Sequence, residues 1–278
     1  MPAPVPLRDH EYKLISGLVY RTFGIVLSEQ KRSLIVGRLN RILRQNGHRS
    51  FKEYYDYVVA DRSGRALSAL VDRISTNHTY FYREKEHFDY LLEQVLPELS
   101  DRGRREQRKV LRIWCSACSS GEEPYTLAML LCEFFGSDLH AWDTGILATD
   151  ISTRMLAIAK EGIYSAENVA RLPEQLRDKY FDAVEGGRWR VKKALKELVV
   201  FRRLNLIRNE YPFKGRFHIV FSRNVMIYFD ESTRNRLVAR YHRYMEPDGY
   251  LFVGHSESLG QNNRFYRYVR PAVYQKKG

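Results

Sequence analysis

Two cysteines and two acids lie within one short stretch, WCSACSSGEEPY, at residues 114–125. Cys115 and Cys118 have the spacing of a redox pair or of half a zinc site. A closed zinc site needs two more ligands, which the sequence does not supply, and a redox pair usually starts a helix at its first cysteine. We therefore interpret both cysteines as small residues that pack a tight turn, and we predict no metal. Cys118→Ser should leave activity almost unchanged.

The acids of the same stretch, Glu122 and Glu123, stand at the predicted start of a helix. Carboxylates are common in a first helical turn because the helix dipole favours negative charge there. Two carboxylates would also repel a phosphate, and the GxGxxG pattern of dinucleotide loops is absent. The stretch therefore favours a ligand that carries positive charge.

The ends of later predicted strands also carry polar side chains. The second strand ends in Asp150, which could accept hydrogen bonds from two ribose hydroxyls. The third and fourth strands are followed by an amide, an apolar side chain and further polar groups: Asn205, Leu206, Arg223, Asn224 and Tyr228. An acid at two strand ends, an amide at the third and Arg-Asn at the fourth are best explained by a nucleoside ligand.

Two other segments are rich in hydrogen-bonding groups. STNHTYFYRE, at residues 75–84, either folds over the site with Asn77, Thr79 and Arg83, or is an interdomain linker with aromatic packing. GHSES, at 254–258, holds histidine and serine together but is not the G-x-S-x-G of an esterase. It is interpreted as a turn at a strand end.

The elements that position these residues are strands alternating with helices. Strands are predicted at 109–115, 144–150, 198–206, 217–225, 249–258 and 265–277, and helices at 124–135 and 153–161. Such alternation predicts an α/β fold with a parallel sheet covered on both faces, which binds ligands beyond the carboxyl ends of its strands. Residues 162–197 break the alternation. Gly186-Gly187 predicts a hairpin there, so this segment is interpreted as an insertion with a small antiparallel sheet.

The N-terminal quarter of the chain is predicted to be helical throughout. Ser28 is a predicted N-cap for a helix at 31–45, which Asn46-Gly47 ends, and another helix follows at 50–60. A helix at 66–74 is predicted to link two domains. The sequence thus predicts a small all-α domain at 1–74, which includes this linker helix, before an α/β domain at 75–278.

Composition narrows the class of protein. Apolar residues make up 44% of the 278 residues, so the chain can bury a core, and no run approaches the roughly 20 apolar residues of a membrane span. The N-terminus lacks the pattern of a signal peptide, and three cysteines do not suggest a disulfide framework, so a cytoplasmic location is expected. The net charge of +13 favours an acidic partner.

In this order, TNHTYFYRE, SACSSGEEPY, ATDIS, Asn205-Leu206, RNVMIYF and GHSES closely resemble the chemotaxis receptor glutamate methyltransferases of the CheR type. The resemblance runs from about Gly24 to the C-terminus. It implies a helical N-terminal domain and a class I methyltransferase fold that uses S-adenosylmethionine. It implies cofactor contacts for Asn77, Thr79, Arg83, Glu123, Asp150, Asn205, Leu206, Arg223 and Asn224. Asp150 would hold the ribose, and Arg83 and Tyr228 would face the substrate carboxylate.

The helix at 31–45 carries Arg38, Arg41 and Arg44 at intervals of three residues, with no acid on that face. The resemblance implies that this face docks on the acidic coiled-coil region of chemoreceptors. Replacing all three arginines by alanine should then abolish receptor methylation and spare cofactor binding. By the same resemblance, the hairpin EGGRWRVKK is about three residues shorter than in members that grip a receptor's C-terminal peptide, so we expect no such tether.

Two other classes of function remain open at this stage. A nucleic-acid methyltransferase would suit the basic charge, and TYFY could stack a flipped base. However, RNVMIYF lacks the prolines of the Asn/Asp-Pro-Pro-Tyr/Phe motif that base amino-methyltransferases typically carry, so we expect no nucleic-acid partner. A non-enzymatic module that only senses the cofactor is the other alternative, but every predicted cofactor position is intact.

Overall fold

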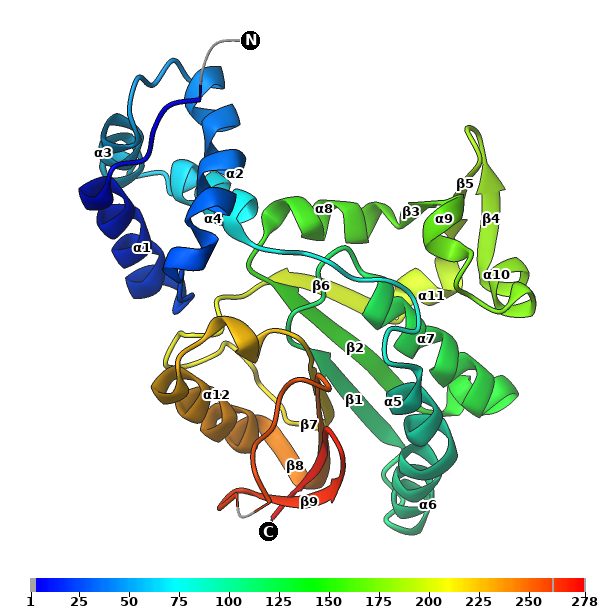
Figure 1. The fold of residues 1–278 in the computed structure, drawn as a ribbon. Coiled ribbons are helices and arrows are strands. Elements are labelled where there is room, and N and C mark those ends of the chain that lie inside the picture. The colour runs from blue at the N-terminus through cyan, green and yellow to red at the C-terminus, as the bar shows by residue number, and fades with distance from the viewer. Residues whose placement is uncertain (1–3, 262, 278) are drawn as a thin grey trace.

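A computed structural model describes residues 4–261 and 263–277 of the chain. The first helices form a separate bundle at one side of the molecule (Figure 1). They are α1 (Asp9–Phe23), the 3₁₀ turn η1 (Glu29–Lys31), α2 (Arg32–Gln45), α3 (Phe51–Ala60) and α4 (Arg65–Ile74). Apolar residues of the four α-helices, such as Val19, Leu39 and Phe51, are buried together in a core of their own. This agrees with the all-α N-terminal part predicted from the sequence.

Helix α4 differs from its predicted role as a linker. Its apolar face, which includes Leu70, Val71 and Ile74, is buried in the core of the helical bundle. The chain instead crosses between the two parts in the irregular segment 75–84, which Figure 1 shows in cyan running from α4 toward α5. An amphipathic helix buries its apolar face against the nearest apolar surface, which here is the bundle.

The rest of the chain is built on a seven-stranded sheet in the order β6-β2-β1-β7-β8-β10-β9. The strands are β1 (Val110–Cys115), β2 (Asp143–Asp150), β6 (Val199–Arg203), β7 (Phe217–Ser222), β8 (Met245–Val253), β9 (Tyr266–Arg270) and β10 (Val273–Lys276). The five strands from β6 to β8 are parallel, whereas β10 and β9 are antiparallel. All the predicted strands are present, and the C-terminal strand material forms a hairpin at the edge.

Helices cover both faces of this sheet. They are α5 (Lys85–Tyr90), the π-helical turn η2 (Leu91–Val95), α6 (Leu96–Arg105), α7 (Glu122–Phe135), η3 (Gly136–Ala141), α8 (Thr153–Glu161), η4 (Met226–Tyr228) and α12 (Glu231–Tyr244). Successive side chains of β1 enter different cores, because strand residues alternate between faces. Ile113 and Cys115 pack with α5–α7, and Trp114 packs with α12 on the other face.

Residues 163–197 form the predicted insertion. Its three-stranded antiparallel sheet has the order β3-β5-β4. The elements are β3 (Ile163–Ser165), α9 (Ala166–Val169), α10 (Glu174–Tyr180), β4 (Phe181–Val184), β5 (Arg188–Val191) and α11 (Lys193–Glu197). Gly186 and Gly187 both have positive φ in the turn between β4 and β5, as the hairpin prediction requires.

The helical bundle is bonded directly to the α/β part of the chain near the end of α1. Tyr20 donates a hydrogen bond to Asp230 Oδ2 at 2.6 Å, and the Val26 N–H donates to the Tyr228 carbonyl at 2.8 Å. These bonds hold the end of α1 against the loop that follows β7. Across 4–261 and 263–277, the structure contains no helix of the length and apolarity needed to cross a membrane.

Candidate active site

A cavity of about 260 Å³ opens at the carboxyl ends of β1, β2, β6 and β7. It is several times larger than the roughly 30 Å³ that one water occupies in the liquid, so it has room for a small organic molecule. Every residue predicted as a cofactor contact lines it: Asn77, Thr79, Arg83, Glu123, Asp150, Asn205, Leu206, Arg223 and Asn224; Tyr228 lines it too. Residues as far apart in sequence as Asn77 and Tyr228 thus share one cavity.

Asp150 is fixed at the end of β2 by backbone donors. Its Oδ2 accepts from the Ser119 N–H and its Oδ1 from the Ser152 N–H, both at 2.8 Å. Burial raises the pKa of this carboxyl, and the backbone hydrogen bonds oppose that rise. A carboxylate has about four acceptor sites, so each oxygen can accept one more bond from the cavity. This geometry fits a ligand with two adjacent hydroxyl groups, such as a ribose.

The turn between β1 and α7 brings backbone close to the cavity. Ser119 adopts a left-handed conformation with φ of 46°, and its N–H points at Asp150. Gly121 follows with φ of 99°, and a Cβ at this position would lie 2.9 Å from Ala159 Cβ and from the Tyr164 hydroxyl. Only glycine fits this position, which ends the turn and begins α7.

A buried charge cluster forms the wall of the cavity beside this turn. The Arg223 side chain is 1% exposed and lies between two acids, with Nη1 at 2.9 Å from Glu123 and Nη2 at 3.1 Å from Glu84. Its guanidinium also stacks over the Phe88 ring and donates to the Arg83 carbonyl. Leaving one charge of such a group without its partner is costly, so these residues hold one another in place.

Cys115 has a polar contact that the sequence interpretation did not include. Its Sγ donates to Glu123 Oε1 at 2.8 Å, because the last residue of β1 faces the first turn of α7. Cys115 therefore fixes the second oxygen of the acid that pairs with Arg223, and its role is not limited to its size. Cys118 is buried and has only a weak contact to the Ser119 carbonyl at 3.7 Å. Burial raises the pKa of both thiols.

The GHSES segment organises the loop after β7. Glu257 accepts hydrogen bonds from the backbone N–H groups of Asn224, Met226, Ile227 and Gly254, at 2.6–3.2 Å. Asn224 has a left-handed φ of 56° and donates from its side chain to Glu84 Oε1. The strand-end turn is thus the support that fixes the Arg223–Tyr228 loop around the cavity.

Three of the other predicted site residues make contacts within the chain. Asn205 donates from Nδ2 to the Thr22 carbonyl at 2.7 Å, so its amide joins the cavity floor to α1. Arg83 donates from Nη1 to the His78 carbonyl at 2.6 Å, which leaves other guanidinium N–H groups for a ligand. The Tyr228 hydroxyl lies 3.3 Å from the Thr76 carbonyl, and burial raises its pKa.

The arginines of α2 are not equivalent. Arg38 is half-buried and donates to the carbonyls of Ile74 and Ser75 at 2.6 and 3.1 Å, and to Thr76 Oγ1 at 3.3 Å. Arg41 and Arg44 are exposed. The docking role of Arg38 stays a prediction, and its guanidinium also binds the segment that crosses between the two parts of the chain.

Several residues around the cavity were missed in the sequence. Phe23 and Ile25 contribute a wall from the helical bundle, and Ser119, Glu84 and Glu257 hold other parts of the site. Glu84 directly follows the predicted Arg83 in STNHTYFYRE, so this motif already contained the residue that pairs with Arg223. Nothing in the spacing of Phe23 or Ile25 indicates that α1 ends against the part of the chain that carries the seven-stranded sheet.

The fold and the site together define a class I methyltransferase, in which an acid ends β2 and the cofactor cavity lies beyond the parallel strands. Residues 77–274 match the family model described as "CheR methyltransferase, SAM binding domain", and residues 10–75 match "CheR methyltransferase, all-alpha domain". The chain belongs to the CheR methyltransferase family.

Curated relatives extend over nearly the whole chain. A chemotaxis protein methyltransferase of Borreliella burgdorferi is 43% identical over 97% of this chain and 94% of its own length. Chemotaxis protein methyltransferase 1 of Pseudomonas aeruginosa is 40% identical over 94% of each chain, and an Escherichia coli chemotaxis protein methyltransferase is 36% identical over 99% and 93%. The similarity covers the helical bundle as well as the cofactor domain.

Proposed function

We propose that this enzyme transfers a methyl group from S-adenosylmethionine to the side-chain carboxylate of glutamates on chemoreceptors, giving glutamate methyl esters. The observation that carries the proposal is the cavity itself. It combines a fixed acid at the end of β2 with a buried Arg223 between Glu84 and Glu123. The family match of both domains supports the same activity.

Each part of the cavity suits one part of the cofactor. Asp150 would accept the ribose hydroxyls with its free acceptor sites. Leu206 is buried and apolar, and would contact the adenine ring. Glu123 would lie near the methionine portion, where its negative charge complements a cation. Asn77, Thr79, Arg83, Asn205, Arg223 and Asn224 would complete the walls.

When bound, the cofactor supplies a methyl group on a sulfonium centre, which a nucleophile can displace. A glutamate side chain is already ionised near neutral pH, so this chain needs no strong general base. Its residues must align the carboxylate oxygen with the methyl group and exclude water. They must not bind the carboxylate too tightly, because its charge is lost as the ester forms.

Arg83 and Tyr228 are the residues we assign to the substrate carboxylate. Both line the cavity, and both already touch segment 75–80 through its carbonyls. Arg83 keeps donors free after bonding to His78, so it can steer and orient a carboxylate. Tyr228 can donate one hydrogen bond to the oxygen that does not attack.

The acidic coiled-coil region of the cytoplasmic part of chemoreceptors is the proposed partner. The exposed Arg41 and Arg44 on α2 would face it. Residues 1–74 carry 13 Lys and Arg against 7 Asp and Glu, so the helical domain has a strong positive charge for its size. The short turn of the β4–β5 hairpin supports methylation without a C-terminal receptor peptide as tether.

The deciding experiment incubates the enzyme with methyl-labelled S-adenosylmethionine and receptor cytoplasmic fragments, with and without the C-terminal pentapeptide. We expect base-labile label on glutamates of the fragment, at equal rates with both fragments. Asp150→Ala serves as the inactive control. Base-stable label in added nucleic acid, or cofactor binding without transfer to any acceptor, would refute the proposal.

A further inference from the structure

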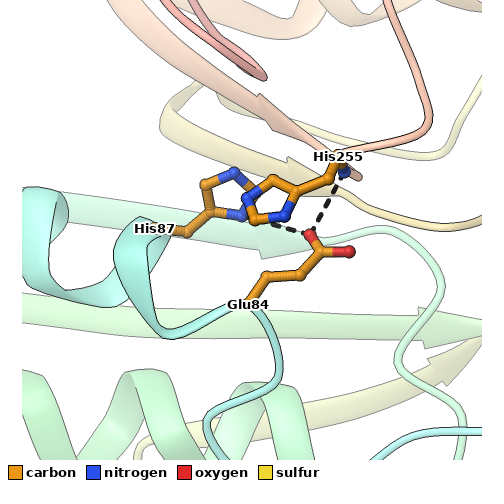
Figure 2. Close-up of side chains that lie close together, drawn as sticks. All are labelled: Glu84, His87 and His255. Carbon is orange, nitrogen blue, oxygen red and sulfur yellow. Dashed lines mark hydrogen bonds and ion pairs between the residues drawn. The ribbon is translucent and has the colours of Figure 1, made fainter.

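Glu84 of the Arg223 charge cluster comes together with His87 and His255. Each offers a ligand atom, and these atoms lie within 4.8 Å of one another. Figure 2 shows the two imidazole rings side by side next to the Glu84 carboxylate. Their ring centroids are 4.7 Å apart. None of the three residues lines the cofactor cavity directly, but Glu84 pairs with Arg223, which does.

His87 gives an independent indication of a ligand at this place. Its side chain is 2% exposed, and among residues 4–261 and 263–277 neither ring nitrogen has a hydrogen-bond partner. Nδ1 faces Glu84 Oε2 at 3.5 Å, which is close but does not form a hydrogen bond. Buried polar atoms nearly always have hydrogen-bond partners. Two ring nitrogens without one in a buried imidazole therefore need an explanation, such as a bound ion.

The geometry and the charge suit a metal ion. Zinc bonds of about 2.0–2.1 Å in a tetrahedral site place two ligand atoms roughly 3.3 Å apart. The 3.5 Å between His87 and Glu84 is near that value. His255 is exposed and lies at the start of an irregular segment, so its ring can turn inward while a fourth position stays open to water. The carboxylates of Glu84 and Glu123 flank the guanidinium of Arg223, so Glu84 brings a negative charge next to the two imidazoles.

We propose that Glu84, His87 and His255 form a binding site for a divalent first-row transition metal such as Zn²⁺. Two imidazoles and one carboxylate are the donor set of zinc sites with an open position. Mg²⁺ and Ca²⁺ prefer all-oxygen sites, so they should bind poorly here.

The site shares an atom with the cofactor wall. Glu84 Oε2 also accepts from Arg223 at 3.1 Å, and Arg223 in turn pairs with Glu123 in the cavity wall. A metal on Glu84 adds positive charge next to Arg223. If the proposed function is correct, metal should weaken binding of the cationic S-adenosylmethionine more than that of neutral S-adenosylhomocysteine. Linkage requires the cofactor to weaken metal binding by the same factor.

The test measures metal binding directly, with the full-length chain freed of any affinity tag and without cofactor. Calorimetry with Zn²⁺ should give one site on the wild type and no comparable heat with Mg²⁺. His255→Ala and Glu84→Gln should weaken Zn²⁺ by at least about tenfold, since each removes a ligand. His140→Ala changes an exposed histidine on η3 and should keep wild-type affinity. The absorption spectrum of the Co²⁺ form should show nitrogen and oxygen ligands without thiolate.

Several outcomes would overturn the site. A wild-type chain that binds no Zn²⁺, or a His255→Ala variant that binds it as well as wild type, excludes this ligand set. Thiolate bands in the Co²⁺ spectrum would show that the metal binds cysteine side chains instead. His255 is on the surface, so its variant should fold even if a His87 variant does not. Because cofactor is absent, failure of the metal site is distinguishable from failure of the methyltransferase proposal.

Discussion

At the scale of single residues, substitutions at the two ends of the cavity should have different effects. A change at Asp150 should weaken cofactor binding, whereas a change at Tyr228 should lower turnover. Asp150→Ala removes the proposed ribose acceptor and also leaves the Ser119 and Ser152 N–H groups without a partner. Hydrogen bonds to a charged group contribute about 1.5–3 kcal/mol each, so cofactor affinity should fall by roughly 100-fold. Calorimetry with S-adenosylhomocysteine measures this, and an unchanged affinity would remove Asp150 from the site.

Tyr228→Phe is the matched change at the substrate end. It removes only a hydroxyl whose contact within the chain is the Thr76 carbonyl at 3.3 Å. Cofactor affinity should therefore stay within about twofold of wild type, whereas turnover should fall by roughly tenfold, the value of one hydrogen bond of about 1.4 kcal/mol. Initial rates at saturating cofactor test this, and equal losses of affinity and rate would place Tyr228 at the cofactor instead.

The two cysteines of the first turn should respond differently. Cys115→Ala removes the donor to Glu123 and a buried sulfur, so we expect a loss of about 1–2 kcal/mol in the free energy of unfolding. Cys115→Ser retains a donor and should lose less. Cys118→Ser changes a side chain whose polar contact, to the Ser119 carbonyl, is weak, and should be nearly silent in activity. Denaturant unfolding compares the two Cys115 variants, and initial methylation rates test Cys118→Ser. Identical unfolding free energies for the two Cys115 variants would leave size as the only role of Cys115.

At the scale of elements, α2 is connected to the active site through segment 75–80. Arg38 holds the carbonyls of Ile74 and Ser75, and Thr76 in turn accepts from Tyr228. Arg38→Ala should loosen this segment and weaken cofactor binding by about fivefold, which corresponds to roughly 1 kcal/mol. Arg41 follows Arg38 by three residues on the same helix and is exposed. Arg41→Ala is therefore the matched control and should keep wild-type cofactor affinity. Equal cofactor affinities for the two variants would show that Arg38 has no effect on the cavity.

The proposed docking face is best tested at its exposed arginines, because Arg38 also binds segment 75–80. Replacing Arg41 and Arg44 by glutamate reverses the charge of the exposed face and should reduce receptor methylation by at least tenfold at low ionic strength. The deficit should shrink as salt screens the charges. Cofactor affinity of this double variant should match wild type. A methylation rate that is insensitive to the charge reversal would mean that the receptor docks elsewhere.

The elements themselves were accessible from the sequence, but their contacts were not. Short apolar runs such as FHIVFS predicted strands such as β7, because strands buried on both faces are mostly apolar. Polar residues at strand ends predicted much of the polar lining of the cavity, because parallel strands present their carboxyl ends at one edge of the sheet. Pairs such as Glu84 with Arg223 depend on how a loop far away in sequence folds back, and no local pattern encodes that.

At the scale of the whole molecule, stability should depend on a buried histidine remote from the predicted site residues. His218 on β7 is buried and accepts from the Arg112 N–H at 3.1 Å. Burial, assisted by nearby arginines, lowers its pKa from 6.5 to about 4. Between these values the unfolded chain binds a proton that the folded chain does not, so unfolding becomes easier as the pH falls.

The expected size of this effect follows from proton linkage. The free energy of unfolding should fall by up to about 1.4 kcal/mol per pH unit from this residue, or up to about 3 kcal/mol between pH 6.5 and 4. His218→Asn keeps an acceptor for the Arg112 N–H but does not titrate. Urea unfolding of both proteins across this range should give curves that converge as the pH falls, because only wild type carries the histidine contribution. Curves that stay parallel would show that His218 is protonated equally in the folded and unfolded chains.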